Sequence, residues 1–345
     1  MLWPERAAGA TNILLIPVLL SFVEVAAGLE SWAGAIIPAV AGFLGAILAS
    51  FPFDREIFPR FTFRAWRRLV TLLWTLRAGF LGVVFACALL MPEKPGVGMA
   101  VIAGGLLLFI FALNFGLYLR FLRGMGVLRF PDERLRKIVA GTVTRMGVRE
   151  PGTWLLDVPL ALAFAMPTTG ELMFSSRLLE ISSDEEISAI CAHELAHLKE
   201  SKCVLAGRLA GSMTLYPLIF MRPAASVGPE AMFAMGALVW LAALFTRKLS
   251  RRMETRADKI ATDNQGEEGV YARALEKIYC DSLIPAVNAS NAKTHPHLYD
   301  RMLAAGIQPD YPRPAKPKRM AELSFLIYLA FGILIVLALA YRSSN

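Results

Sequence analysis

Seven blocks of mostly apolar residues, each 18 to 23 residues long, constrain this chain more than any other feature of its sequence. An α-helix of that length can cross the hydrocarbon core of a bilayer, which is about 30 Å thick. The composition agrees, since 56% of the 345 residues are hydrophobic and only 19% are charged, against about 25% charged residues in soluble domains. The sequence therefore predicts a multi-pass α-helical membrane protein with about seven spans. The blocks are residues 12–29, 32–50, 69–91, 98–119, 204–221, 229–246 and 323–341.

Positive charge predicts how these spans are oriented. The connection between the second and third blocks contains five arginines between positions 55 and 68, whereas the connections after the third and fifth blocks contain one basic residue each. Because basic loops stay in the cytoplasm, we expect the amino terminus and both large polar regions, residues 120–202 and 247–322, on the cytoplasmic side of the plasma membrane, the inner membrane of a bacterium. The net charge of +8 is assigned to contacts with anionic lipid head groups, and no nucleic-acid partner is expected.

Three charged residues, Glu24, Arg77 and Arg208, lie within the apolar blocks. Arg208 is close enough to the cytoplasmic end of its block for the guanidinium to reach the interface. Glu24 and Arg77 either pair inside the bundle, line a water-filled cavity or lie at the interface. The four cysteines form no CxxC pair, so we expect reduced thiols that pack as small apolar groups.

The first polar region predicts a mixed α and β fold. A helix is expected over residues 133–146, where acidic residues open an apolar-periodic stretch. Ser183 and Glu186 have the spacing of a capping box and predict a second helix that ends near Lys202. Three β-like runs are expected between the two helices, at residues 153–156, 160–166 and 171–175.

The second of these helices contains the sequence His193-Glu194-Leu195-Ala196-His197. Two histidines four residues apart lie on one helix face, so both imidazoles can bind one zinc ion, and Glu194 on the adjoining surface can take a proton from a zinc-activated water. The alternative, two histidines that merely lie on a helix surface, is disfavoured because the chain has only four histidines. Charged residues flank the motif on both sides, which argues against a helix embedded in lipid.

A hydrolytic zinc site needs a third protein ligand and an open position for water. Carboxylates, the cysteines, His295 and His297 are candidates, and Glu254 is preferred. Glu254 lies four residues before Asp258 on one face of a predicted helix, so it can bind the metal while Asp258 holds a ligand in place. This pair alone would also fit an exposed charged helix face. It gains weight because two spans return the chain to the side of the two histidines.

These motifs, in this order, resemble those of the M48 family of membrane zinc metallopeptidases, which includes HtpX-like and Ste24-like proteins. The resemblance covers roughly residues 130–305: HELAH, an apolar hairpin, the sequence SRRMETRAD around Glu254, and a His-Pro pair followed by Arg301. It implies a cytoplasmic α+β catalytic domain of the zincin (gluzincin) type, with one Zn²⁺ per chain bound by His193, His197 and Glu254.

The resemblance also implies roles for other residues. Glu194 would be the general base and later the proton donor, and Asp258 would support the metal ligands. His295 and Arg301 match the histidine and arginine of the family's His-Pro motif, placed to stabilise the oxyanion or the substrate carbonyl. An edge strand that pairs with an extended substrate would contain Ala163, Phe164 and Ala165.

The motifs divide the chain into five predicted regions. Residues 1–119 hold four spans, 120–202 the first half of the catalytic domain with the edge strand and the HELAH helix, 203–246 a transmembrane hairpin, 247–322 the second half with the Glu254 helix and the His-Pro motif, and 323–345 the last span and the tail.

Two features depart from the family pattern. Leu162 replaces an asparagine before the edge strand, and four predicted spans precede HELAH where HtpX-like members have two, so the branch within the family stays open.

The predicted function is that of an integral-membrane zinc endopeptidase, which hydrolyses peptide bonds with a zinc-activated water and a glutamate base. Its expected partners are protein or peptide substrates, such as misfolded membrane proteins in quality control, and the lipid bilayer. Two alternatives remain open: a CAAX-type prenyl-protein endopeptidase with the same chemistry, and a catalytically inactive, zinc-stabilised membrane scaffold. The complete ligand set and the intact Glu194 argue against the scaffold. The sequence predicts neither the physiological substrate nor the oligomeric state.

Overall fold

The computed structural model describes residues 32–73, 79–287 and 296–316, together with the single positions 20, 24, 330 and 334. The first and last predicted spans therefore lie outside the described residues, apart from these single positions. The chain forms two compact units. One comprises residues 1–66, 283–285 and 315–345, and the other comprises residues 67–282 and 286–314.

In the first unit, helix α3 (Trp32–Ile57) covers the second predicted span. Its carboxyl-terminal part packs on the start of α4 (Phe63–Leu73), where the ring of Phe51 lies 5.2 Å from that of Trp66. The indole nitrogen of Trp66 donates a hydrogen bond of 2.8 Å to the carboxylate of Asp54. Aromatic packing and this hydrogen bond therefore close the turn between the two helices.

Three helices among the described residues are long and apolar enough to cross a membrane, and all lie in the second unit: Val97–Gly124, Lys202–Val227 and Pro229–Asp263. They correspond to the fourth, fifth and sixth predicted blocks. The prediction of seven spans is therefore wrong as a count for the described chain. The third block, for example, is divided between the end of α4 and the short helix α5 (Gly79–Leu90), with residues 74–78 outside the description. An apolar block has a length, but the length does not say whether one continuous helix fills it.

The first of these spans contains a break. It consists of α6 (Val97–Ala112), the π-helical turn η2 (Leu113–Leu117) and α7 (Tyr118–Gly124). Gly116 in the break has a φ of 106°, a conformation that glycine adopts without a steric penalty. The hydroxyl of Thr168, in a turn of the sheet described below, donates a hydrogen bond of 2.6 Å to the carbonyl oxygen of Asn114. The break thus connects this membrane helix to the sheet.

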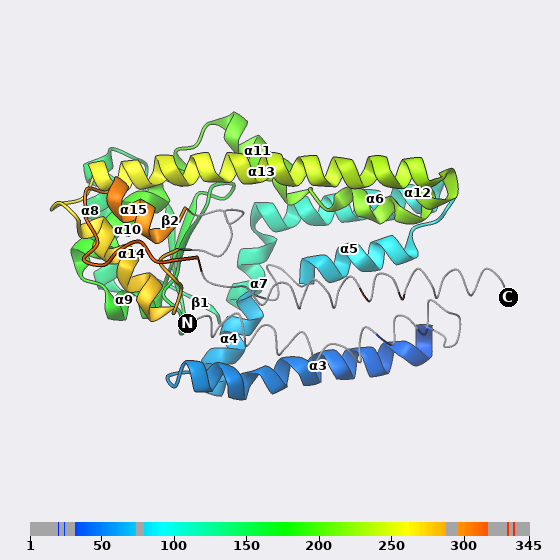
Figure 1. Cartoon of the computed structure of the whole chain (residues 1–345), viewed down its shortest axis with the longest axis horizontal. Coiled ribbons are helices and arrows are strands. Elements are labelled where there is room, and N and C mark those ends of the chain that lie inside the picture. Colours follow the sequence, from blue (N-terminus) through cyan, green and yellow to red (C-terminus); the bar gives the residue numbers. More distant parts are fainter. Residues whose placement is uncertain are drawn as a thin grey trace. The chain divides into compact units, whose positions relative to one another are not determined.

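The second and third spans form a hairpin. The chain passes through α11 (Lys202–Ser212), η3 (Tyr216–Phe220) and α12 (Met221–Val227) and returns as α13 (Pro229–Asp263). Helix α13 is one continuous rod of 35 residues, with α11 beside it (Figure 1). The two helices approach closely at Gly207, where an added Cβ would lie 2.6 Å from a methyl group of Leu249. Small residues at four-residue spacing, here Gly207 and Gly211, permit such close packing of membrane helices.

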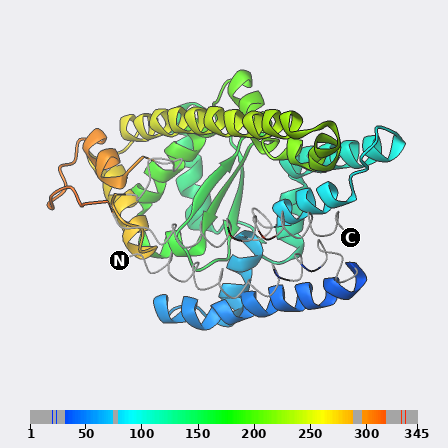
Figure 2. The same ribbon diagram turned by 45° about the vertical axis from the view of Figure 1, so that its right-hand side comes forward.

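A four-stranded sheet follows the first span, with the strand order β1-β2-β4-β3. The strands are β1 (Leu128–Arg129), β2 (Gly152–Leu156), β3 (Ala163–Met166) and β4 (Glu171–Ser175). Strands β2 and β4 are parallel, and β3 pairs antiparallel with β4, so β3 lies at an edge of the sheet. Figure 2 shows the strands of this sheet as green arrows. The predicted strands are confirmed, although the second is shorter than residues 160–166.

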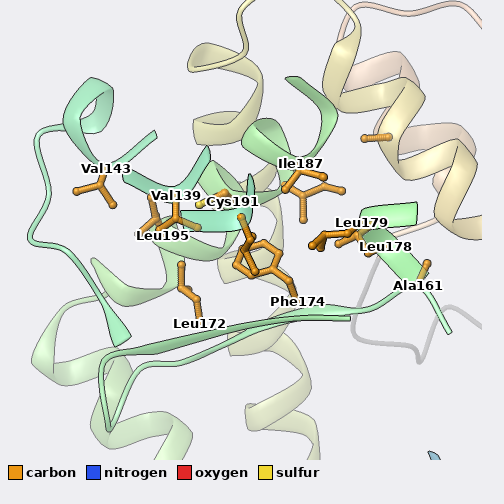
Figure 3. Packing of buried hydrophobic residues seen from close by; sticks show 13 residues of the cluster. Val139, Val143, Ala161, Leu172, Phe174, Leu178, Leu179, Ile187, Cys191 and Leu195 are labelled. Carbon is orange, nitrogen blue, oxygen red and sulfur yellow. The ribbon is translucent and has the colours of Figure 1, made fainter. Parts of the chain in front are cut away.

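Two helices cover one face of this sheet, α8 (Glu133–Met146) and α10 (Asp184–Leu198). Each begins as predicted: the side chain of Asp132 caps α8, and Ser183 and Glu186 form a capping box at α10. Side chains from the sheet and both helices meet in one core (Figure 3). Each large apolar side chain buried there contributes roughly 1.5–3 kcal/mol relative to exposure. The core includes Val139, Leu172, Phe174, Ile187, Cys191 and Leu195.

Three more helices complete the second unit: α9 (Ser176–Ile181), α14 (Val270–Asp281) and α15 (Leu298–Ala304). Helices α14 and α15 form a second core beside α10 and α13, which includes Ala189, Ala261, Tyr271 and Met302. Helix α10 is therefore packed on two sides. This packing fixes its rotation about its axis and thereby the direction in which its polar side chains point.

Candidate active site

Helix α10 places His193 and His197 on the face opposite the sheet core. Cys191 and Leu195 of the same helix are buried in that core, with at most 1% of their surface exposed. The two histidine rings consequently lie side by side, 5.0 Å apart between centroids, and both side chains are buried. The helical spacing of the motif thus brings its two imidazoles together as predicted.

Helix α13 packs against α10 and supplies the third candidate ligand. One carboxylate oxygen of Glu254 lies 3.5 Å from His193 Nε2, and the other lies 3.6 Å from His197 Nε2. One ligand atom from each of the three residues lies within 4.8 Å of the others. Zinc bonds of about 2.0–2.1 Å in a tetrahedral arrangement place neighbouring ligand atoms about 3.3–3.4 Å apart. The donor types and their spacing therefore fit zinc.

The remaining ring nitrogen of His193 is held by a buried polar group from helix α14. The Tyr271 hydroxyl lies 2.8 Å from His193 Nδ1 and donates a hydrogen bond of 2.6 Å to Asp258. Because the tyrosine gives its only hydrogen to Asp258, the hydrogen between Tyr271 and His193 belongs to the imidazole. His193 therefore carries its proton on Nδ1 and directs the lone pair of Nε2 at the metal position.

Asp258 is in turn bound by Arg301 of helix α15. The guanidinium donates two hydrogen bonds, of 2.9 and 2.6 Å, to the two carboxylate oxygens, and a third of 2.9 Å to the Tyr271 hydroxyl. Burial raises the pKa of Asp258, but the hydrogen bond with His193 and the charge of Arg301 outweigh it and hold this pKa well below its usual range. Burial also raises the pKa of Tyr271 well above 10. Asp258 is therefore an anion and Tyr271 a neutral donor at neutral pH.

His197 has a carboxylate partner of its own. Its Nδ1 lies 2.9 Å from Glu200, whose side chain is only 3% exposed. Arg208, on the membrane helix α11, places two nitrogens 2.5 Å from the two oxygens of Glu200. Burial raises the pKa of Glu200, but the hydrogen bonds with His197 and Arg208 lower it by a larger amount. The net shift of this pKa is therefore downward. Both histidines are thus backed by a carboxylate that an arginine holds.

Other predicted site residues have the following places. Glu194 is buried, with 7% of its surface exposed, on the helix turn between the two histidines. Ala163, Phe164 and Ala165 lie in the edge strand β3, which packs against α10. His297 precedes α15 and is partly exposed. His295 lies outside the described residues, as does Arg77.

Sequence reasoning missed three residues of this arrangement: Tyr271, Glu200 and the inward role of Arg208. Tyr271 lies 13 residues beyond Asp258, at no spacing that a helix or strand period would single out. Glu200 lies three residues after His197, and this spacing on one helix face was a usable signal.

Comparison with known proteins agrees with this geometry. The model of Peptidase family M48 matches residues 130–306, which are 177 of the 345 residues. A protease HtpX homolog from Methanothermobacter thermautotrophicus is 26% identical over 230 residues, which cover 61% of this chain and 88% of that protein. A protease HtpX homolog from Burkholderia thailandensis is 25% identical over 244 residues, which cover 64% of this chain and 84% of that protein. The match to the family model contains all three ligands and the helices that carry them.

Proposed function

The chain belongs to peptidase family M48, and from this premise we propose that it is an integral-membrane endopeptidase whose substrates are membrane proteins that require quality control. The observation that carries the proposal is the convergence of His193, His197 and Glu254, with ligand atoms within 4.8 Å of one another. These three residues would hold one zinc ion per chain. When bound, zinc lowers the pKa of water towards about 7 and polarises the scissile carbonyl.

We assign the proton transfers to Glu194. Its carboxylate, on the buried surface beside both histidines, takes the proton of the attacking water and delivers it to the leaving amine. Since His193 is held by Tyr271 and Asp258, its ring has one orientation throughout these steps. Exclusion of bulk water from the buried site strengthens each of these interactions.

We propose that His295, the histidine of the His-Pro motif, stabilises the oxyanion. The Arg301 guanidinium is 6% exposed and donates to Asp258 and Tyr271. We therefore assign Arg301 to holding Asp258 in place, and only through it to the reaction. This differs from the role that the family resemblance implies for the arginine.

Substrate binding is proposed at strand β3. An edge strand can add an extended peptide by main-chain hydrogen bonds, and side chains of the peptide then alternate between the two faces. Ala163 and Ala165 pack against the core between the sheet and α10, so the outer main-chain edge of β3 is the part proposed to pair with the peptide. The main-chain N–H of Leu162, where the family has asparagine, donates to the Ser175 hydroxyl, and its carbonyl oxygen accepts from the Ser175 N–H. Leu162 therefore contacts the sheet through its main chain and has no side-chain amide.

We propose further that residues 120–202 and 247–322 form one catalytic domain on the cytoplasmic side, joined across the hairpin 203–246. Support comes from the positive charge between positions 55 and 68 and from the hairpin itself, which returns α13 to α10. Labelling of an engineered exposed cysteine by a membrane-impermeant reagent tests this side. Labelling in intact cells before lysis would contradict it.

The decisive experiment compares the full chain in detergent with its Glu194→Gln variant. We expect one zinc per chain in both, and cleavage of model membrane and soluble substrates to fall by about 100- to 10,000-fold in the variant. Glu185→Gln is the matched control, since Glu185 is an exposed glutamate of the same helix, and its activity should stay within twofold. Undiminished cleavage by Glu194→Gln contradicts the mechanism.

The same preparations separate the two alternative functions. A CAAX-type enzyme would cleave a farnesylated peptide in preference to unfolded membrane proteins. An inactive scaffold would bind zinc and cleave no member of a peptide library.

A further inference from the structure

The carboxylate of Glu200 connects a metal ligand to a membrane helix. Glu200 lies just after α10, within 2.9 Å of His197 Nδ1. Its two oxygens face Arg208, which belongs to α11 at the start of the candidate span Lys202–Val227. At 3% exposure the Glu200 side chain is shielded from water almost completely. Arg208 therefore supplies the positive charge that a buried carboxylate requires.

The geometry of this ion pair is directional. Nε and Nη2 of Arg208 each approach a different oxygen of Glu200 at 2.5 Å, which is the bidentate arrangement of a planar guanidinium with a planar carboxylate. Arg208 Nη2 also lies 3.1 Å from His197 Nδ1. A ring that gives its Nε2 lone pair to a metal carries its hydrogen on Nδ1, so His197 donates to Glu200. Arg208 thus holds the acceptor of that hydrogen bond.

The two metal-binding histidines are supported from different parts of the chain. At His193, the carboxylate is Asp258 and the arginine is Arg301 of helix α15. At His197, the arginine comes instead from the membrane hairpin. The close contact of α11 with α13 at Gly207, one residue before Arg208, holds the latter in position.

We propose that Glu200 and Arg208 are positioning residues for His197. Zinc affinity therefore depends on the position of membrane helix α11, which carries Arg208, relative to the metal ligands. The proposal rests on the zinc site of the proposed function. A carboxylate behind a ligating histidine fixes its tautomer and orientation and raises its basicity, and loss of such a partner typically weakens metal binding by about 10- to 100-fold. Loss of Arg208 acts through Glu200, whose carboxylate then loses the two contacts that hold it against His197.

The test measures zinc affinity rather than proteolysis. The full chain carrying Glu194→Gln, the variant expected to have lost proteolytic activity, is purified in detergent. Its zinc dissociation constant is measured by competition with a chromophoric chelator. Glu200→Gln and Arg208→Gln should each weaken zinc binding by about 10- to 100-fold. The double variant should be no weaker than the more affected single one, because the two residues act as one unit.

Two further variants distinguish positioning from a general structural effect. Arg208→Lys keeps the charge but not the bidentate contact, and its affinity should lie between those of the parent and Arg208→Gln. Arg222→Gln is the matched control: Arg222 lies in the same candidate span and pairs with Glu93 at 3.1 Å, but its side chain is 50% exposed. It should bind zinc within twofold of the parent. The visible spectrum of the Co²⁺-substituted proteins should change in the Glu200 and Arg208 variants and not in Arg222→Gln.

The outcomes separate this proposal from the proposed function. If the parent binds zinc and Glu200→Gln, Arg208→Gln and Arg208→Lys bind it within twofold, the positioning role is overturned and the metal site stands. If the parent itself binds no zinc while it is folded, the proposed function fails first. If Arg208→Gln does not fold, Arg208→Lys and Glu200→Gln decide the question alone.

Discussion

Replacement of Asp258 by asparagine tests the network behind His193 most severely. The side chains of Asp258 and Arg301 are 13% and 6% exposed, and two hydrogen bonds join them. Asp258→Asn preserves the shape but leaves the guanidinium of Arg301 buried without a counter-charge. Removal of one partner from such a buried pair costs about 3–5 kcal/mol. For a folding unit of about 150–250 residues, which is the size range of the second unit, that corresponds to a fall in Tm of roughly 6–20 °C.

The chain offers a closely matched control in α15, the helix that contains Arg301. Asp300 also pairs with an arginine through two contacts, Arg313 Nη1 at 2.5 Å and Nη2 at 3.0 Å, but these side chains are 40% and 48% exposed. Asp300→Asn should therefore cost only about 0–1 kcal/mol. Both variants are measured by thermal unfolding in detergent after chelation, so that metal binding contributes to neither value. A loss for Asp258→Asn within about 1 kcal/mol of that for Asp300→Asn would refute the argument from burial.

Three further predictions concern residues of helices α10, α13 and α14. Tyr271→Phe removes the hydroxyl that links His193, Asp258 and Arg301, so it should weaken zinc binding about tenfold and cost roughly 1–3 kcal/mol of stability, both measured as above. The pKa of Asp258 is lowered in the folded state, so the stability that its carboxylate contributes is complete above the unfolded-state pKa of about 3.9. This stability is lost as the pH falls toward the folded-state pKa. At pH values below about 4, the Tm of the chelated parent should therefore decrease more steeply with pH than that of Asp258→Asn. Burial raises the pKa of Cys191 to about 12, so a thiol reagent should modify the exposed Cys280 in the native protein and Cys191 only after unfolding, as mass spectrometry of digests would reveal.

The metal ligands were predictable from sequence because two of them are local to one helix and the third follows from the topology of the chain. His193 and His197 share a helix face by their four-residue spacing, and Glu254 follows from the two intervening spans, which return the chain to the same side. The caps of α8 and α10 were predictable for the same reason, since Asp132 and Ser183 act within three residues of themselves.

The partners of these ligands were not predictable in the same way, because they depend on tertiary packing. Tyr271 reaches His193 only because α14 packs on α10. Arg208 was expected to extend toward the cytoplasmic end of its block, and its guanidinium lies at Glu200, just before the span Lys202–Val227. That Glu200 is its partner depends on the packing of α11 against α13. Block length led to an overestimate of the number of spans, since only three helices among the described residues are long and apolar enough to cross a membrane. The π-helical turn at Gly116, inside one of them, is invisible to hydropathy.

Helix α13 joins a candidate membrane span to a metal ligand without interruption. Its 35 residues extend over about 52 Å at 1.5 Å per residue, and the ligand Glu254 lies about 24 Å along this rod from the centre of its apolar half. A tilt of about 5° made to match a thinner bilayer would move that ligand by roughly 2 Å at this lever arm. Metal–ligand distances tolerate only about 0.2 Å. Packing of α13 against α10 must therefore hold Glu254 in place. Without it, the geometry of the metal site would change with the thickness of the membrane.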